Sequence, residues 1–234
     1  MMINDLPKAV NNTERMAERI WMVESQLVDE GIQDKAVLES MRLVPRHHFV
    51  MEDMKQFAYD SRPLPITHGQ TISQPYIVAL MAQALELKKD DRVLEIGTGS
   101  GYSAAVLSRI IKKVYTIERH AELAMTAEAS FRELNYENIE IKVGDGTKGW
   151  PEKAPFNGIL VTAGGPEIPV SLIEQLAPGG RLVIPVGRRK MQELIRMRCD
   201  ESGSSEYTQE NLGQVRFVPL IGDEGWAERV NPFS

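Results

Sequence analysis

The sequence predicts an α/β fold in which a doubly wound, mostly parallel sheet of seven strands follows an N-terminal helical lobe. From about residue 86 onward, short runs of Val, Ile and Leu alternate with helical patterns, which is typical of parallel strands covered on both faces. Before that point the apolar residues recur at helical spacing. A chain of 234 residues is long enough to bury one core, so we expect a single domain with a helical lobe over 1–85 and an α/β core over 86–234.

Three helices are expected in the lobe, over residues 14–30, 35–44 and about 75–87. Gly31 is a suitable residue to end the first helix, and Asp34 can cap the second. The second helix should end before Pro45, because proline cannot continue a helix at that point. Periodicity fades between residues 46 and 71, where we expect an ordered loop.

Strands and helices alternate in the core. Strands are expected over Arg92–Gly97, Lys113–Glu118, Ile139–Asp145, Gly158–Ala163 and Arg181–Gly187. Helices are expected over residues 101–111, about 121–134 and 170–176. Two further runs, ELIRMRC and QVRFVPL, flank the polar segment ESGSSE and predict a terminal antiparallel pair.

A glycine-rich turn, VLEIGTGSGY, joins the first core strand to its helix. It places Gly97, Gly99 and Gly101 at G-x-G-x-G spacing, and Glu95 stands on the strand before them. The dinucleotide fingerprint needs a third glycine where this chain has Tyr102. The tighter turn favours a nucleoside with an amino-acid tail over a pyrophosphate.

Two acidic residues follow the next strands in register with that turn. Glu118 ends the second core strand, where a carboxylate can accept both hydroxyls of a ribose. Asp145 ends the third, in GDGTKGW, where the amino group of an adenine could donate to it. The carboxyl ends of parallel strands meet at one rim, where open sheets bind their ligands. A structural turn with two surface acids is the competing interpretation.

A polar stretch precedes the helix that leads into the core. In ITHGQTISQPYIVALM, Ser73 stands just before Pro75, and proline is favoured in a first helical turn. Free amides and the positive end of a helix favour an anion at that position. The competing interpretation is that Ser73 only caps the helix, which would contribute about 1 kcal/mol of stability.

These motifs together resemble the class I S-adenosylmethionine-dependent methyltransferases, and among them the protein-L-isoaspartate O-methyltransferases. The resemblance runs from about Gly31 to Leu220 and is carried, in order, by LPITHGQTISQPYIVALM, VLEIGTGSGY, GDGTKGW, VTAGGPEIP, APGGRLVIPVG and VRFVPL. The glycine motif is common to the whole class, whereas TISQP is specific to the family. Asn157 stands where the family commonly has Asp, and Ala163-Gly164-Gly165 replaces the usual small-residue turn.

The resemblance implies a Rossmann-like sheet, S-adenosyl-L-methionine as cofactor, and methyl transfer to the free α-carboxylate of L-isoaspartyl residues, with D-aspartyl residues left open. The methyl ester then closes to a succinimide, which partly reopens as aspartate. Carried over to this sequence, the family's catalytic serine is Ser73. The implied cofactor-binding residues are Gln70, Thr71, Glu95, Gly97, Thr98, Gly99, Ser100, Gly101, Glu118, Asp145 and Gly146.

The chemistry explains why no base is needed. An α-carboxyl group has a pKa of about 3.3–3.7, so the nucleophile is already ionised at neutral pH. Alignment of carboxylate oxygen, methyl carbon and sulfur can lower the barrier by roughly 7–11 kcal/mol. Two other functions remain open on the residues alone: methylation of another acceptor, RNA or a small molecule, and a non-catalytic protein that only binds the cofactor or a partner.

Composition limits the partners and the cellular location that we expect for the protein. A net charge of −6 gives little support for nucleic-acid binding, and one cysteine, Cys199, cannot form an internal disulfide. The first residues show no signal-peptide pattern and no run of eighteen apolar residues occurs, so we expect a cytoplasmic protein without a membrane span. His47 and His48 are adjacent, so their side chains should diverge, and no metal site is predicted. A monomer is the simplest expectation.

Overall fold

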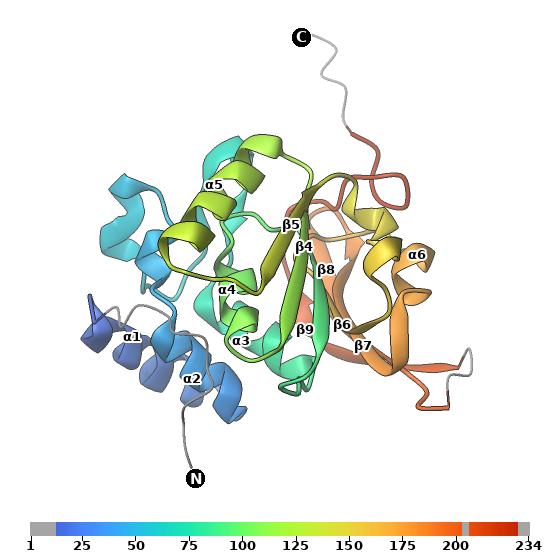
Figure 1. The fold of residues 1–234 in the computed structure, drawn as a ribbon, viewed down its shortest axis with the longest axis horizontal. Helices are drawn as coiled ribbons and strands as arrows, with labels where there is room; N and C mark the ends of the chain where they lie inside the picture. The colour runs from blue at the N-terminus through green and yellow to red at the C-terminus, as the bar shows by residue number, and fades with distance from the viewer. Residues whose placement is uncertain (1–12, 203–205, 229–234) are drawn as a thin grey trace, which may run out of the picture.

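The computed structural model describes residues 13–202 and 206–228 (Figure 1). Some sequence-based expectations concern residues 1–12 and the tip of the ESGSSE turn, residues 203–205. Both segments lie outside the described residues. The α-helices are α1 (Met16–Val23), α2 (Lys35–Leu43), α3 (Pro75–Ala84), α4 (Tyr102–Ser108), α5 (Ala121–Glu133) and α6 (Val170–Ile173). No helix in this part of the chain is long and apolar enough to cross a bilayer.

A seven-stranded sheet forms the centre of the molecule and confirms the predicted fold class. Its strands are β3 (Arg92–Ile96), β4 (Lys113–Glu118), β5 (Ile139–Val143), β6 (Phe156–Val161), β7 (Leu176–Arg188), β8 (Met191–Cys199) and β9 (Tyr207–Val215). They lie in the order β5-β4-β3-β6-β7-β8-β9. The first four pairs are parallel and the last two are antiparallel. Helices α3, α4 and α5 lie on one side of the sheet and α6 on the other (Figure 1).

The last strand begins earlier than the sequence predicts. β9 pairs Tyr207 with Cys199 directly after the turn, whereas the apolar run QVRFVPL suggested a strand over residues 214–220. β9 is an exposed edge strand, so its polar residues carry no apolar alternation that would reveal it. Residues after Val215 leave the edge, and Pro219 forms an isolated bridge with Gly164 instead. The predicted antiparallel pair is therefore confirmed, but the bounds expected for its second strand were wrong, because only Gln214 and Val215 of QVRFVPL belong to β9.

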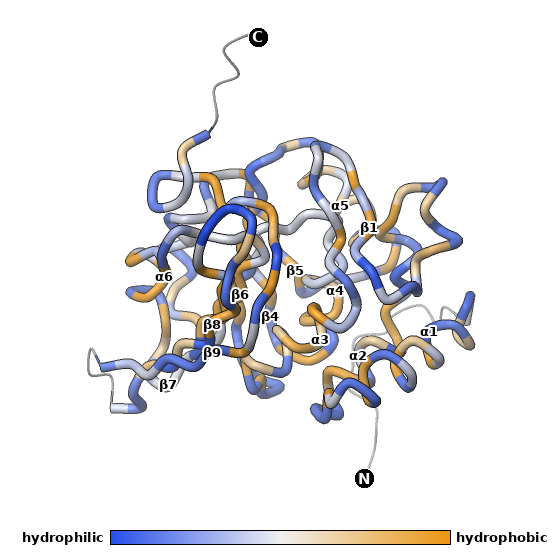
Figure 2. Tube along the Cα trace, turned by 180° about the vertical axis from the view of Figure 1, so that it is seen from behind, coloured by the Kyte–Doolittle hydropathy of each residue, from blue (hydrophilic) through white to orange (hydrophobic). Residues whose placement is uncertain are grey.

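The helical lobe packs into the same core as the sheet. α1 continues as a short π-helix, η1 (Glu24–Val28), and the Asp34 carboxylate accepts from the amides of Ala36 and Val37, which confirms the predicted cap. The Ser40 hydroxyl at the inner face of α2 donates to the Val106 carbonyl of α4 at 2.7 Å. Figure 2 shows the hydrophobic residues gathered along α3 and the strands, with hydrophilic residues on the outer turns.

Short elements replace the loop expected between residues 46 and 71. They are the 3₁₀ turns η2 (Arg46–His48), η3 (Glu52–Phe57) and η4 (Thr67–Gly69), and the strands β1 (Leu64–Pro65) and β2 (Thr71–Ile72). β1 and β2 pair antiparallel, with Leu64 opposite Ile72. This hairpin carries the TISQP segment to the start of α3. Two more 3₁₀ turns follow β5, namely η5 (Gly146–Lys148) and η6 (Pro151–Lys153).

Candidate functional site

The central cavity lies where the direction of the sheet reverses. The chain runs from β3 outward through β4 to β5, and then returns to place β6 on the other side of β3. Such a switch point leaves a crevice outside the carboxyl ends of the two central strands. The cavity there is lined from four directions: by the turn after β3, the ends of β4 and β6, the β1–β2 hairpin with α3, and residues 218–221.

Most of the predicted site residues meet in this cavity. Those that line it are Gln70, Thr71, Ser73, Gly97, Thr98, Gly99, Ser100, Glu118 and Gly146. The three predicted residues that do not line it are Glu95, Gly101 and Asp145. The structure thus places nine of the predicted residues at the cavity and three beside or beneath it.

Glu118 is the carboxylate most directly placed for a ligand. Its side chain is buried at the end of β4, where Oε2 accepts from the Gly99 amide and Oε1 from the His120 amide, both at 2.9 Å. These bonds fix the carboxylate against the glycine turn. Each oxygen has a second lone pair, so the group can still accept from two neighbouring hydroxyls.

Gly97 brings the backbone close to β6. Its φ is 95°, and a Cβ at this position would lie 2.4 Å from Thr162 Oγ1. The same Thr162 hydroxyl is 2.6 Å from the Gly97 carbonyl oxygen, to which it donates. A side chain at residue 97 would therefore push the turn away from β6 and into the cavity.

Gly101 serves helix packing. Its φ is 89°, and a Cβ here would meet the Phe131 ring of α5 at 2.7 Å. The third glycine of the turn therefore lets α4 start close to α5. Its place in the motif does not imply contact with a ligand.

Glu95 lies beneath the turn and is fully buried. The Thr116 hydroxyl donates to its Oε2 at 2.6 Å, and the Thr98 hydroxyl in turn is 2.7 Å from Thr116 Oγ1. Burial raises the pKa of Glu95 to about 7, although the hydrogen bond from Thr116 works against that shift. Its Oε1 has no hydrogen-bond partner among the described residues. This chain of hydroxyls links the buried acid to Thr98, which does line the cavity.

Asp145 anchors the segment that follows β9. Its Oδ1 accepts from the amide and the hydroxyl of Thr147, and its Oδ2 accepts from the Asp223 amide at 2.8 Å. Burial alone would raise the pKa of Asp145, but these hydrogen bonds hold it below its usual value. Asp145 therefore holds residues 222–224 in place, next to the cavity-lining residues 218–221.

Ser73 lies at the cavity wall, two residues before the start of α3. Gln74 is the N-cap residue of α3 and Pro75 is its first residue, so Ser73 does not cap the helix. Within residues 13–202 and 206–228, the Ser73 hydroxyl has no hydrogen-bond partner. The competing interpretation of Ser73 as a structural cap is therefore wrong, and its hydroxyl is available to a ligand.

Arg46 is a site residue that the sequence analysis missed. Its guanidinium is fully buried and donates from Nη2 to the Ser73 carbonyl at 2.9 Å and from Nε to the Ala58 carbonyl at 2.7 Å. It also lies 4.8 Å from the centre of the Tyr102 ring, which lines the cavity. No sequence signal separates such a buried arginine from an exposed one, although VPRHHFV belongs to a stretch that resembles the family.

Thr162 and the segment 218–221 were missed as well. Thr162 stands at the end of a predicted strand, so its position at the rim could have been inferred from the sheet. Residues 218–221 come from beyond the last strand, and Gly164 holds them through its amide and carbonyl, which bond to Val218 and Leu220. No local pattern predicts that this segment returns to the sheet.

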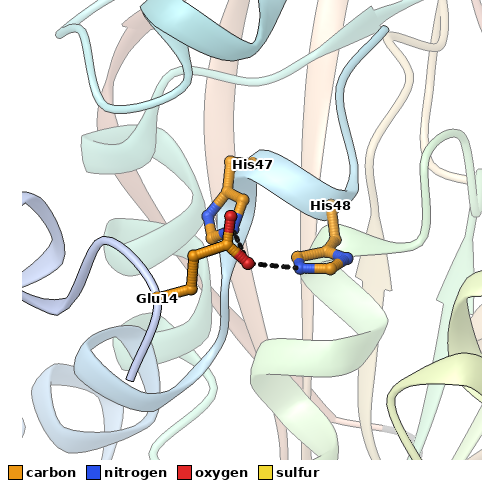
Figure 3. A group of neighbouring side chains, drawn as sticks. All are labelled: Glu14, His47 and His48. Carbon is orange, nitrogen blue, oxygen red and sulfur yellow. Dashed lines mark ion pairs between the residues drawn. The ribbon is translucent and has the colours of Figure 1, made fainter. Parts of the chain in front are cut away.

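The two adjacent histidines differ from expectation. Their ring centres are 4.6 Å apart, and both Nε2 atoms face the Glu14 carboxylate (Figure 3). The expectation that the side chains diverge was wrong, because the tight η2 turn brings both rings to the same side. This cluster lies on other elements than the central cavity.

The cavity fits a nucleoside with an amino-acid tail. Glu118 offers acceptor positions suited to the two ribose hydroxyls. Because Gly97 has no side chain and lies close to Thr162, its backbone is exposed at the cavity wall. The apolar side chains of Val78, Met81 and Leu160 line the same space and exclude water. Thr71 and Ser73 line the same cavity on the side of the β1–β2 hairpin. A methyl acceptor would have to approach the amino-acid tail of the ligand from that side.

Comparison with known proteins identifies the family. The family model described as protein-L-isoaspartate(D-aspartate) O-methyltransferase (PCMT) matches residues 19–225. The protein-L-isoaspartate O-methyltransferase of Pelotomaculum thermopropionicum is 55% identical over 219 residues, covering 94% of this chain and 95% of the relative. The protein-L-isoaspartate O-methyltransferase 1 of Syntrophobacter fumaroxidans is 57% identical over 205 residues, covering 88% and 94%.

Solved structures agree with this assignment. A protein-L-isoaspartate O-methyltransferase structure superposes with a TM-score of 0.79 at 28% identity, covering 90% of this chain and 67% of that one. A Plasmodium falciparum protein described as a beta-aspartate methyltransferase, in complex with S-adenosyl-L-homocysteine, gives a TM-score of 0.74 at 25% identity, covering 87% and 98%. Since both the family model and close relatives span most of its length, this chain belongs to the protein-L-isoaspartate O-methyltransferase family.

Proposed function

We propose that Ser73 binds and orients the substrate carboxylate in the reaction that this chain, as a member of its family, catalyses: methyl transfer from S-adenosyl-L-methionine to isoaspartyl residues of proteins and peptides. One observation carries the proposal: the Ser73 hydroxyl, free of any capping bond, lines the same cavity as Glu118 and the glycine turn. We further propose that D-aspartyl residues, which the family description includes, are accepted.

The cofactor-binding residues are proposed on the same geometry. Glu118 holds the ribose, the backbone of residues 97–100 supports the amino-acid tail, and Gly146 borders the adenine. Gln70 and Thr71 line the acceptor side. Glu95, Gly101 and Asp145 support these groups from behind, through Thr98, the start of α4 and the segment 218–224. S-adenosyl-L-methionine supplies a methyl group already activated by its positively charged sulfur.

The residues of the chain have to align the substrate carboxylate with the methyl group and the sulfur of the cofactor. The substrate carboxylate is ionised at neutral pH, so no side chain has to remove a proton. The Ser73 hydroxyl donates to one carboxylate oxygen and leaves the other free to attack. The positive charge of Arg46, next to the Ser73 carbonyl, favours the anion without bonding to it directly. The apolar wall keeps water away from the reacting atoms.

We also propose that the lobe and the core form one unit and that the protein is a cytoplasmic monomer. The lobe over 1–85 and the core over 86–234 form one folding unit, because the inner face of α2 bonds to α4 and both contribute to one apolar cluster. The single cysteine, Cys199, is free and suits a cytoplasmic protein. We propose a monomer, which leaves the hairpin side of the cavity open to varied peptides.

A paired-peptide assay tests the function. The protein is incubated with S-adenosyl-L-methionine labelled on the methyl group and with two peptides that differ only in an L-isoaspartyl or L-aspartyl linkage. We expect label to be transferred to the isoaspartyl peptide and to be released on mild alkaline hydrolysis, as a methyl ester should be. Equal labelling of both peptides, or label that resists hydrolysis, would refute the proposed acceptor.

A further inference from the structure

A second cluster of side chains lies on η2 and the segment that leads into α1. Glu14 Oε2 is 3.5 Å from His47 Nε2 and 3.7 Å from His48 Nε2, and the three ligand atoms lie within 4.8 Å of one another (Figure 3). These atoms converge from two separate parts of the lobe. The cluster plays no part in the methyl transfer proposed above.

The distances are those of ligands around a metal ion. They exceed the usual hydrogen-bond length between nitrogen and oxygen, which is about 2.7–3.2 Å. Ligands bound at about 2.0–2.1 Å in a tetrahedron stand roughly 3.4 Å apart. The two Glu14–histidine distances, 3.5 and 3.7 Å, are close to that edge, and the exposed Glu14 side chain can adjust to an ion between the three groups.

His47 supplies the strongest evidence. The residue is 2% exposed, and its Nε2 points at Glu14 without a hydrogen-bond partner among the described residues. Its other nitrogen, Nδ1, lies 2.7 Å from the Tyr59 hydroxyl. A histidine that ligates a metal characteristically has its second nitrogen held in this way, which fixes the ring orientation. An unsatisfied nitrogen at a buried position otherwise costs about 1–3 kcal/mol.

His48 has a similar outer partner. Its Nδ1 lies 3.8 Å from a carboxylate oxygen of Glu133 on α5, while its Nε2 faces Glu14. The carboxylate–histidine arrangement is a common outer contact of zinc ligands. Glu14 and His48 both reach solvent, so an ion has access to the cluster.

A second histidine–glutamate pair in the chain provides a contrast. His68 Nε2 lies 2.8 Å from Glu122 Oε2, which is an ordinary hydrogen bond. That pair leaves no gap for an ion between its atoms. The longer distances at Glu14 are therefore not a general property of such pairs in this chain.

We propose that Glu14, His47 and His48 bind one divalent transition-metal ion, with Zn²⁺ fitting the two-nitrogen, one-oxygen donor set best. The remaining coordination position faces solvent and takes water. The ion fastens the segment before α1 to η2, whose first residue, Arg46, holds the Ser73 carbonyl. The site is structural, and it does not depend on the assignment of Ser73.

Metal titration of the full chain tests this site. Protein freed of metal with a chelator is titrated with ZnCl₂ by calorimetry and followed by thermal unfolding, with MgCl₂ in parallel. We expect one Zn²⁺ per chain and a rise in Tm of about 5 °C or more at 100 times Kd, with no effect of Mg²⁺. Titration with CoCl₂ should give the absorption of a four- or five-coordinate ion without a thiolate charge-transfer band.

Three variants assign the ligands. Glu14→Gln and His48→Asn alter side chains that reach solvent and should leave the fold intact, and each is expected to weaken Zn²⁺ binding at least about tenfold. His68→Asn, the matched control, should change affinity less than about twofold. A dissociation constant weaker than about 100 µM is that of a weak surface contact. Absence of binding at that concentration of ZnCl₂ would overturn the proposal. Unchanged binding in the protein that carries both Glu14→Gln and His48→Asn, a thiolate band from Cys199, or loss of binding in His68→Asn would overturn it as well.

Discussion

The guanidinium of Arg46 donates to the backbone carbonyl of Ser73, with 2.9 Å between Nη2 and O. Burial lowers the pKa of Arg46 to about 10, so the group is still a cation at neutral pH. Within the described residues it forms no ion pair, and it donates to the carbonyl oxygens of Ala58 and Ser73. An unneutralised charge therefore stands directly behind the residue proposed to receive an anion.

Arg46→Lys should separate charge from geometry. Lysine keeps the charge but cannot donate to both the Ser73 and the Ala58 carbonyls in the fork geometry of arginine. The loss of one such bond corresponds to about 1.4 kcal/mol, so we expect kcat to fall roughly tenfold. The dissociation constant of S-adenosylhomocysteine, measured by calorimetry, should stay within about twofold. An equal loss of both quantities would show that Arg46 supports the whole fold and not the position of Ser73.

Ser73→Ala should remove methyl transfer and leave cofactor binding unchanged. The hydroxyl makes no structural hydrogen bond, so its removal should change the free energy of unfolding by less than about 0.5 kcal/mol. We expect kcat/KM for an isoaspartyl peptide to fall about 100-fold, comparable to the loss of one oriented donor at a reacting anion. Ser61→Ala, which removes an exposed hydroxyl that bonds to Gln74, is the matched control. If Ser73→Ala lost cofactor affinity alone, its assignment would be mistaken.

Glu118→Ala should act on cofactor affinity. The carboxylate holds the Gly99 and His120 amides and is proposed to accept the ribose hydroxyls. Loss of charge-assisted bonds worth about 1.5–3 kcal/mol should raise the dissociation constant of S-adenosylhomocysteine roughly 10- to 150-fold. Glu122→Ala, at an exposed acid that bonds to His68, provides the comparison. Similar losses in both variants would point to general electrostatics.

Substitution of two glycines of the turn should affect different quantities, stability at residue 101 and cofactor affinity at residue 97. Gly101→Ala places a methyl group against Phe131 at an unfavourable φ, so we expect a stability loss of about 2 kcal/mol with cofactor affinity nearly unchanged. Gly97→Ala places its Cβ 2.4 Å from Thr162 Oγ1, which pushes the turn into the cavity and should weaken cofactor binding more than tenfold. Denaturant unfolding and calorimetry on both proteins measure the two effects. The reverse pattern would contradict the distinction between packing and binding.

The pKa of Glu95 predicts a pH dependence of stability. Because burial raises its pKa to about 7, the folded protein holds a proton that an unfolded glutamic acid releases at about 4.3. Between these two values the free energy of unfolding should fall as pH rises, and it should level off above pH 7. Glu95→Gln should flatten this slope, by a difference on the order of 2 kcal/mol between pH 5 and pH 8. Chemical unfolding without cofactor at several pH values measures it, and equal slopes in the two proteins would contradict the raised pKa.

The sheet could be predicted because its signals are local. Each parallel strand is a continuous apolar run, and the glycine turn with Glu118 lies within one βαβ unit. The polar strand β9 gave no such signal, since all of its residues except Leu212 and Val215 are exposed at the edge of the sheet. The short β1–β2 hairpin was missed for a similar reason, because two-residue strands carry no periodicity.

The site was predictable where a motif makes the contact and not where distant residues meet. Ser73 and Glu118 belong to motifs, and they line the cavity. Asp145 belongs to one too, but its carboxylate is engaged by the Asp223 amide, a contact across 78 residues that sequence cannot show. Arg46 reaches Ser73 across 27 residues, and its burial depends on packing of the complete lobe.

The return of residues 218–221 to the cavity has a consequence for biosynthesis. Glu118 and the glycine turn are synthesised about a hundred residues before Leu220, so residues 218–221 of the cavity wall do not yet exist when the turn leaves the ribosome. A partial chain can therefore fold its central strands without a finished pocket. We therefore expect uptake of the methyl donor only after residues 218–221 have been translated, so partial chains that end before them should not compete for the donor.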